Sequence, residues 1–242
     1  GVWATFFGVG FSITALLVPE DFAWLYGAHG LLALGVGLLL WRMLPKGAVT
    51  MRRPMPGLAA HLTIYKTPRL AAPGLGRGVY AMLFLALVTF LPERLGALWL
   101  APILPVAGIT GSLLTGLLMR AIPPGALVWG GFATMGGLFG LSLLAGGAAP
   151  FILIVAFVVS GVVAGAGFAA IPWLNAELED RALANGALAQ LGNVGTFIGT
   201  PLFAALAPGT LLPVAIGICF AAAAATGLAY RAARHRAVID QT

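Results

Sequence analysis

Residues 150–171 read PFILIVAFVVSGVVAGAGFAAI, a run with no charged residue. About 20 mainly apolar residues are needed for a helix to cross the hydrocarbon layer of a membrane, and this run is long enough. The whole chain of 242 residues is 60% hydrophobic and 8% charged, with a mean hydropathy of +1.01. A soluble domain carries about 25% charged residues. The composition therefore predicts an integral membrane protein and excludes a soluble enzyme, a nucleic-acid-binding protein and a disordered chain.

Similar apolar runs recur along the whole chain. Eight lie between charges and Pro/Gly clusters, at 1–18, 24–44, 76–92, 97–119, 125–146, 150–171, 183–206 and 210–230. None has the short alternating segments of a transmembrane barrel. The sequence predicts an all-α polytopic transmembrane bundle of about eight spans, or seven if two neighbouring runs merge. Because the chain starts at Gly1 without a signal-peptide pattern, it is either processed or lacks its beginning, and we favour the second interpretation.

The basic residues gather on one side of the predicted membrane. From Arg42 to Arg77, the stretch that joins the second and third runs contains seven Lys or Arg residues and no acid, and the tail after position 230 adds three Arg residues. With eight spans, Arg120 and Arg181 lie on that same side, and Arg94 alone lies on the other. Lys and Arg mark cytoplasmic loops, so we predict a cytoplasmic C-terminus.

One long connection divides the chain. Residues 45–75 contain five prolines, which makes a continuous helix improbable there. Within it, 57–65 (GLAAHLTIY) either lies along the membrane surface as a short helix or belongs to a solvated linker. We therefore predict two helices in 1–44, a basic cytoplasmic linker in 45–75, a six-helix bundle in 76–232 and a cytoplasmic tail in 233–242.

This order of spans resembles the later two-thirds of a major facilitator superfamily transporter. In that family two six-helix bundles, each a pair of inverted three-helix repeats, are joined by a long cytoplasmic loop. Residues 108–120 (GITGSLLTGLLMR) resemble the family's loop signature in Gly111, Gly116 and Arg120, but Met119 stands where an acid is usual. Residues 172–206 (PWLNAELEDRALANGALAQLGNVGTFIGTPLFAAL) resemble its helix 10–11 connection. The resemblance implies helices 5 to 12 of a bacterial inner-membrane protein, partnered by helices 1 to 4 upstream of Gly1.

Polar side chains within the runs are neutral, and no Asp, Glu, Lys or Arg is expected well inside a span. Four residues of run 183–206 share one helix face by their spacing: Gln190, Asn193, Phe197 and Thr200. This face either forms interhelical hydrogen bonds or lines a central solute path, as helix 11 does in the resembling family. Weaker candidates for the path are Tyr80, Thr89 and Ser12. A path without fixed charge points to a neutral or amphipathic solute, or to one whose charge is met by the first bundle.

Two further patterns concern packing and gating. Three glycine pairs, Gly136–Gly140, Gly161–Gly165 and Gly195–Gly199, have the small-xxx-small spacing that allows helices to approach closely, either as static packing or as sliding surfaces. The cluster after the sixth run contains Glu177, Glu179, Asp180 and Arg181. It is either a solvated loop or a salt-bridge latch that opens and closes with the bundles.

The function predicted from these observations is secondary transport of a small solute by alternating access, in contact with the lipid bilayer. A single cysteine, Cys219, and three scattered histidines exclude a disulfide framework and a Cys/His metal cluster, and no cofactor, metal or nucleic acid is expected. The alternatives are a non-transporting polytopic membrane protein and an interfacial membrane enzyme. We predict no enzyme, because no span end offers a convergent set of His, Asp and Glu residues.

Overall fold

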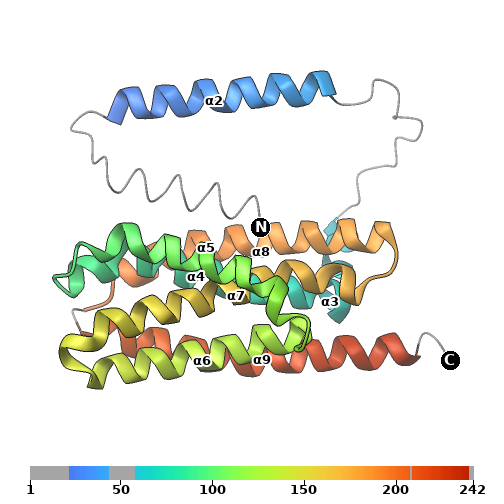
Figure 1. The fold of residues 1–242 in the computed structure, drawn as a ribbon. Coiled ribbons are helices and arrows are strands. Elements are labelled where there is room, and N and C mark those ends of the chain that lie inside the picture. Colours follow the sequence, from blue (N-terminus) through green and yellow to red (C-terminus); the bar gives the residue numbers. More distant parts are fainter. Residues whose placement is uncertain (1–21, 44–57, 208, 240–242) are drawn as a thin grey trace.

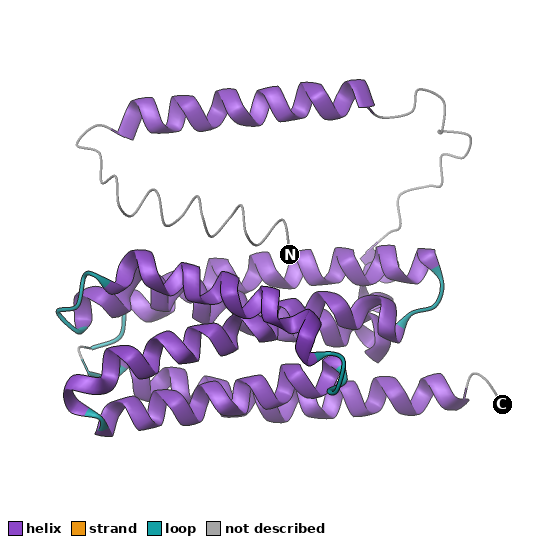
Figure 2. Ribbon diagram, in the orientation of Figure 1, coloured by secondary structure: helices purple, strands orange, loops and turns teal. Residues whose placement is uncertain are grey.

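The computed structural model describes residues 22–43, 58–207 and 209–239. Every regular element in these ranges is a helix, and no strand occurs among them, which confirms the all-α fold class (Figures 1 and 2). The α-helices are α2 (Phe22–Met43), α3 (Leu58–Lys66), α4 (Pro68–Arg94), α5 (Leu100–Leu118), α6 (Pro124–Leu144), α7 (Ala149–Leu174), α8 (Leu178–Ala204) and α9 (Leu211–Ile239). A short 3-10 helix, η1 (Gly146–Ala148), precedes α7. The predicted span 1–18 lies outside the described residues.

Five of the helices are long and apolar enough to cross a membrane, which indicates an integral membrane protein. They are Pro68–Arg94, Leu100–Leu118, Pro124–Leu144, Gly146–Leu174 and Leu211–Arg234. Helix α8 has 27 residues but is less apolar, because Gln190, Asn193 and several Gly and Thr residues occupy its middle. In α2, the apolar stretch Gly30–Met43 is exposed along its whole length.

The linker predicted for 45–75 is shorter than expected, because α4 begins at Pro68. Pro68 occupies the first turn, where a missing N–H costs nothing. Pro73 lies inside the helix and leaves the carbonyl of Arg69 without its usual donor. The side-chain amide of Asn175 supplies that hydrogen bond, with a distance of 3.2 Å from Nδ2 to the Arg69 oxygen. A donor from the α7–α8 connection thus allows the helix to run through a proline that, in the sequence alone, predicts a break.

Helices α4 to α9 pack side by side as one bundle, each antiparallel to the next along the chain (Figure 1). The main contacts pair α4 with α8, α5 with α7, α6 with α7, α4 with α9, α6 with α9 and α4 with α7. Exchanging α4 with α7, α5 with α8 and α6 with α9 reproduces the same set of pairs. Since α4 and α7 run in opposite directions, this exchange is that of an inverted repeat of three helices.

Two of the tightest contacts are related by the same exchange, and both depend on glycine. A Cβ added to Gly161 of α7 would lie 1.9 Å from the Gly108 carbonyl oxygen of α5. A Cβ added to Gly195 of α8 would lie 1.9 Å from the Gly78 carbonyl oxygen of α4. Both helix pairs therefore touch backbone to backbone, as small-xxx-small spacing predicts. In the remaining glycine pair predicted from sequence, Gly136 of α6 lies against Phe220 and Cys219, whereas Gly140 faces open space.

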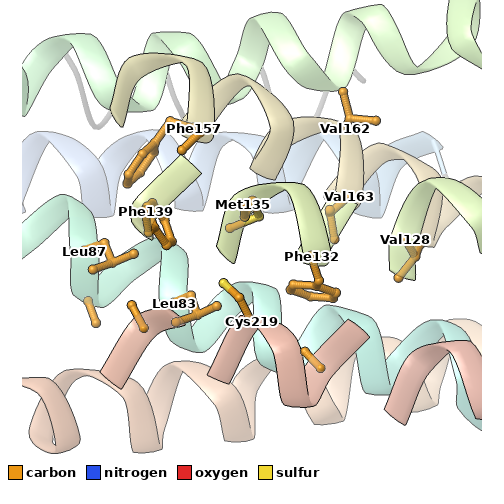
Figure 3. Close-up of a cluster of buried hydrophobic side chains, with 14 of the residues drawn as sticks. Leu83, Leu87, Val128, Phe132, Met135, Phe139, Phe157, Val162, Val163 and Cys219 are labelled. Carbon is orange, nitrogen blue, oxygen red and sulfur yellow. The ribbon is translucent and has the colours of Figure 1, made fainter. Parts of the chain in front are cut away.

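The apolar core lies where α4, α6, α7 and α9 meet. Phe132, Phe139 and Phe157 are fully buried there, together with Leu83 and Cys219 (Figure 3). Helices α5 and α8 also contribute buried residues to this core, among them Leu104 and Phe203.

Candidate functional site

A cavity of about 460 Å³ lies between α4, α5 and α7, with Thr196 of α8 at its edge. Its size falls within the range of small-molecule sites, roughly 300–1,000 Å³. Most lining side chains are apolar. The others are Arg77, Tyr80, Ser112, Thr115 and Thr196. A second cavity of about 310 Å³, between α5, α6 and α7, has Thr134 as its one polar side chain.

Arg77 is the charged residue of the larger cavity, and it lies well inside α4. It follows Pro68 by nine residues, so its Cα is about 14 Å from the start of the helix. The candidate membrane-spanning helix Pro68–Arg94 contains Arg77. The span predicted from sequence began at residue 76, whereas α4 begins eight residues earlier and has Arg77 in its third turn. The expectation that no charged residue lies well inside a span stays a prediction.

Aromatic rings hold the Arg77 guanidinium. Its Cζ lies 5.0 Å from the centroid of the Tyr80 ring and 5.5 Å from that of the Phe168 ring. The aliphatic part of the side chain passes over Gly192 of α8, where an added Cβ would lie 3.2 Å from Cγ. Within the described ranges, no carboxylate lies within ion-pair distance of Arg77, and the one ion pair there joins Arg69 to Asp180. Arg77 thus presents a positive charge to the cavity without a described counter-charge.

An aromatic wall continues from Arg77 towards the core. The Tyr80 and Phe84 rings stack with centroids 5.2 Å apart, and Phe84 lies 5.6 Å from Phe157 at a tilted angle. Gly108 of α5 leaves room for this wall, since an added Cβ would lie 2.9 Å from Phe84 Cε2. The cavity therefore has a cationic part at Arg77 and an aromatic, apolar part beyond it.

Two hydroxyl groups of α5 donate to backbone carbonyls. Ser112 Oγ donates to the Gly161 carbonyl of α7 at 3.1 Å. Thr115 Oγ1 donates to the Gly111 carbonyl of its own helix at 3.1 Å and lies 3.4 Å from the Val162 carbonyl of α7. Each hydroxyl keeps lone pairs but uses its single proton in the protein. These two groups are therefore acceptors towards anything that enters the cavity, and Arg77 supplies its N–H donors.

The predicted polar face of α8 lies away from this cavity. Gln190, Asn193 and Phe197 are exposed, and Phe197 is 81% exposed. They occupy the side opposite the glycines that touch α4, while Thr200 is half-buried. The Tyr65 hydroxyl of α3 donates to Gln190 Oε1. The residue of α8 that lines the cavity is Thr196, which the face assigned from sequence had omitted.

The other residues predicted to line a solute path differ in where they lie. Tyr80 lines the cavity. Thr89 is exposed and donates its hydroxyl proton to the Leu85 carbonyl of its own helix at 2.8 Å. Ser12 lies outside the described residues.

The three residues of the predicted loop signature, in and just after α5, also lie in different environments. Gly111 is buried against α7, where an added Cβ would lie 1.8 Å from the Val158 carbonyl oxygen. Gly116 lines the cavity and faces open space, so a side chain would fit there. Arg120 is exposed just after the end of α5.

The charged cluster between α7 and α8 joins helices of the bundle through an ion pair and hydrogen bonds. Arg69 of α4 pairs with Asp180 of α8 and donates to Asn175 Oδ1 at 3.3 Å. Arg181 Nε donates to the Asn175 carbonyl at 2.9 Å. Glu177 is the exposed residue before α8, and makes no side-chain cap. The contacts of Asp180 and Arg181 join α8 to α4 and to Asn175 in the α7–α8 connection. All of these parts belong to one bundle.

Comparison of the chain with family models, curated proteins and solved structures found no match. The central residue that sequence reasoning missed is Arg77, which was assigned to the basic linker. Its spacing held a signal: Arg77, Tyr80 and Phe84 recur at i, i+3 and i+7, the spacing of one helix face.

Proposed function

We propose that this protein is a secondary transporter of the major facilitator type, which moves a small solute by alternating access. The observation that carries the proposal is the contact pattern of α4 to α9, which is preserved when α4, α5 and α6 are exchanged with α7, α8 and α9. Inverted repeats of this kind give a carrier two related conformations, with the solute site at the repeat interface.

The position of the cavity supports this assignment. Its lining comes from α4, α5, α7 and α8, which form two pairs under the exchange, while α6 and α9 contribute none of its lining residues. In such an arrangement α4, α5, α7 and α8 correspond to helices 7, 8, 10 and 11 of the family, and α6 and α9 to helices 9 and 12. The upstream helices then cover the cavity from the other side.

The charge distribution supports an orientation. Arg69, Arg181 and Arg234 lie at the end of the bundle where α4 begins and α9 ends, and Arg94 lies at the opposite end (Figure 1). We assign the first end to the cytoplasm. The Trp173 ring lies 5.1 Å from Arg234 Cζ at this end, and Trp is typical of either membrane interface. The proposed location is a bacterial inner membrane with a cytoplasmic C-terminus.

The glycine contacts bear on how access alternates. Backbone contacts at Gly161 and Gly195 leave no space for one helix to slide past the other without separating. The Arg69–Asp180 pair closes the same bundle at its basic end. In the proposed mechanism α4 to α9 move as one rigid body against the upstream helices, which favours static packing over sliding for these glycines.

Transport is tested in two steps with the purified protein. Solutes are first screened for a rise in unfolding temperature, reported by a thiol-reactive dye on Cys219, which is buried in the fold. A solute present at 100 times its Kd stabilises the folded protein by about 2.7 kcal/mol. Solutes that stabilise the protein are then tested for counterflow in liposomes.

The counterflow result decides between a carrier and its alternatives. Liposomes loaded with unlabelled solute should transiently accumulate labelled solute from outside without an energy source, and protein-free liposomes should not. Stabilisation by a solute without counterflow of that solute would identify a non-transporting membrane protein and contradict the proposal.

A further inference from the structure

We infer that the cavity binds an organic monoanion with an apolar body, such as a carboxylate, and that Arg77 receives its anionic group. This inference rests on the proposed function and names the class of solute. It replaces the expectation of a path without fixed charge, because that expectation rested on the absence of a charged residue inside the spans.

The first argument is the cost of Arg77 at its position. A charged side chain in a membrane-spanning helix is costly unless an opposite charge is near. The cation–π contacts with Tyr80 and Phe168 offset part of that cost. They stabilise the cation but do not neutralise it, and no carboxylate among the described residues does so. An anionic solute supplies the missing charge.

The second argument is the geometry of the guanidinium. The guanidinium has five N–H donors in a planar fork and no acceptor. The aromatic rings of Tyr80 and Phe168 lie 5.0 and 5.5 Å from its Cζ and cannot use all five donors, which leaves some of them for a planar acceptor. A carboxylate matches this arrangement because its two oxygens accept a pair of parallel N–H bonds.

The third argument is the rest of the cavity. Beyond Arg77 the lining is Phe84, Leu85, Ile109 and further apolar side chains, and the hydroxyl protons of Ser112 and Thr115 are already used. An inorganic anion would leave this surface without a partner. A dianion would leave its second charge unpaired at a high desolvation cost. One cation beside an apolar wall fits one anionic group on an apolar body.

Direct binding to the purified full chain tests the inference. The probes are octanoate, 3-phenylpropanoate and 2-naphthylacetate, each compared with its own primary amide by isothermal titration calorimetry in detergent. The amides keep the shape and remove the charge. A hydrogen bond to a charged group contributes about 1.5–3 kcal/mol, so at least one carboxylate should bind about tenfold or more tightly than its amide.

Substitutions test whether Arg77 is the source of the preference for a carboxylate over its amide. Arg77→Gln should abolish the preference for the carboxylate and leave amide binding unchanged, whereas Arg77→Lys should keep part of it. Arg94→Gln is the matched control, since it removes the same charge from the other end of the same helix, and should retain the full preference. Phe168→Leu should weaken carboxylate and amide alike, because it removes apolar surface and one cation–π contact while Arg77 remains. If Arg77→Gln does not fold, the partial loss of the preference in Arg77→Lys provides the test.

The outcomes separate this inference from the proposed function. Equal affinity for every carboxylate and its amide, or a carboxylate preference that persists in Arg77→Gln, would overturn the anion site. Counterflow of a neutral solute without any carboxylate preference would also overturn it and leave the transporter intact. A carboxylate preference that depends on Arg77, without counterflow of that probe, would support the site and contradict the transport proposal.

Discussion

Replacing Gly161 by Ala tests the backbone contact between α5 and α7. The new Cβ would lie 1.9 Å from the Gly108 carbonyl oxygen and 2.8 Å from the Ser112 nitrogen. Real Cβ contacts are essentially never shorter than 3.0 Å, so the two helices must separate by about 1.1 Å at this point. Overpacking of this kind costs about 1–3 kcal/mol. The hydrogen bond from Ser112 to the Gly161 carbonyl crosses the same contact and would lengthen.

The matched control is Gly167→Ala on the same helix, where the nearest atom to an added Cβ is 3.9 Å away. Both variants gain the higher helix propensity of Ala, so the difference between them isolates the contact. A thiol-reactive dye on Cys219 measures the unfolding temperature in detergent. We expect Gly161→Ala to unfold about 2–12 °C below Gly167→Ala, from about 2–4 °C per kcal/mol for a chain of this size. Equal unfolding temperatures for the two variants would refute the backbone contact.

Three further predictions use the same unfolding assay. Asn175→Ala should cost about 1–3 kcal/mol, because it removes the donor to the Arg69 carbonyl in a buried place; a cost below 1 kcal/mol would show that α4 tolerates Pro73 without it. Asp180→Asn should cost about 1 kcal/mol or less, because both side chains of the Arg69–Asp180 pair are partly exposed, and a loss above 2 kcal/mol would contradict that assignment. Tyr230→Phe should be neutral or stabilising by up to about 1 kcal/mol, since among the described side chains the buried Tyr230 hydroxyl has no hydrogen-bond partner; a clear loss of stability would show that the hydroxyl has one in the membrane.

The helices and their order could be predicted from sequence because each is a long apolar run. Six of the predicted runs, from 76–92 onward, correspond to α4 to α9, and 24–44 corresponds to α2. Small-xxx-small spacing also located the close contacts of α7 and α8 before the fold was known. These patterns are local, and the membrane environment leaves a helix as the means of satisfying their backbone groups.

The start of α4 could not be predicted, because it depends on a residue far away in the chain. Pro73 removes one backbone donor, and Asn175, about a hundred residues later, replaces it. Local rules for proline therefore predicted a linker where the tertiary structure supports a helix. The later predicted start placed Arg77 at the beginning of its run, whereas α4 has it in its third turn, beside the cavity.

The polar face of α8 illustrates a different limit. Spacing correctly grouped Gln190, Asn193 and Phe197 on one side of the helix, but periodicity does not say what that side faces. The opposite side is fixed by Gly195 and Gly199 against α4, which turns the polar residues outward from the bundle. Thr196, between the two faces, is the residue that reaches the cavity.

The most direct test of alternating access is the reaction of a cysteine at position 196 from each side of the membrane. Thr196→Cys is exposed at the edge of the cavity, and Cys219 is buried and should stay unreactive. Leu228→Cys is the control, exposed on α9, which does not line the cavity. We predict that Thr196→Cys reacts with a membrane-impermeant thiol reagent added to either side, and that a bound solute changes the two rates in opposite directions, while Leu228→Cys does not respond to the solute. Reaction from one side under all conditions would contradict the transporter assignment.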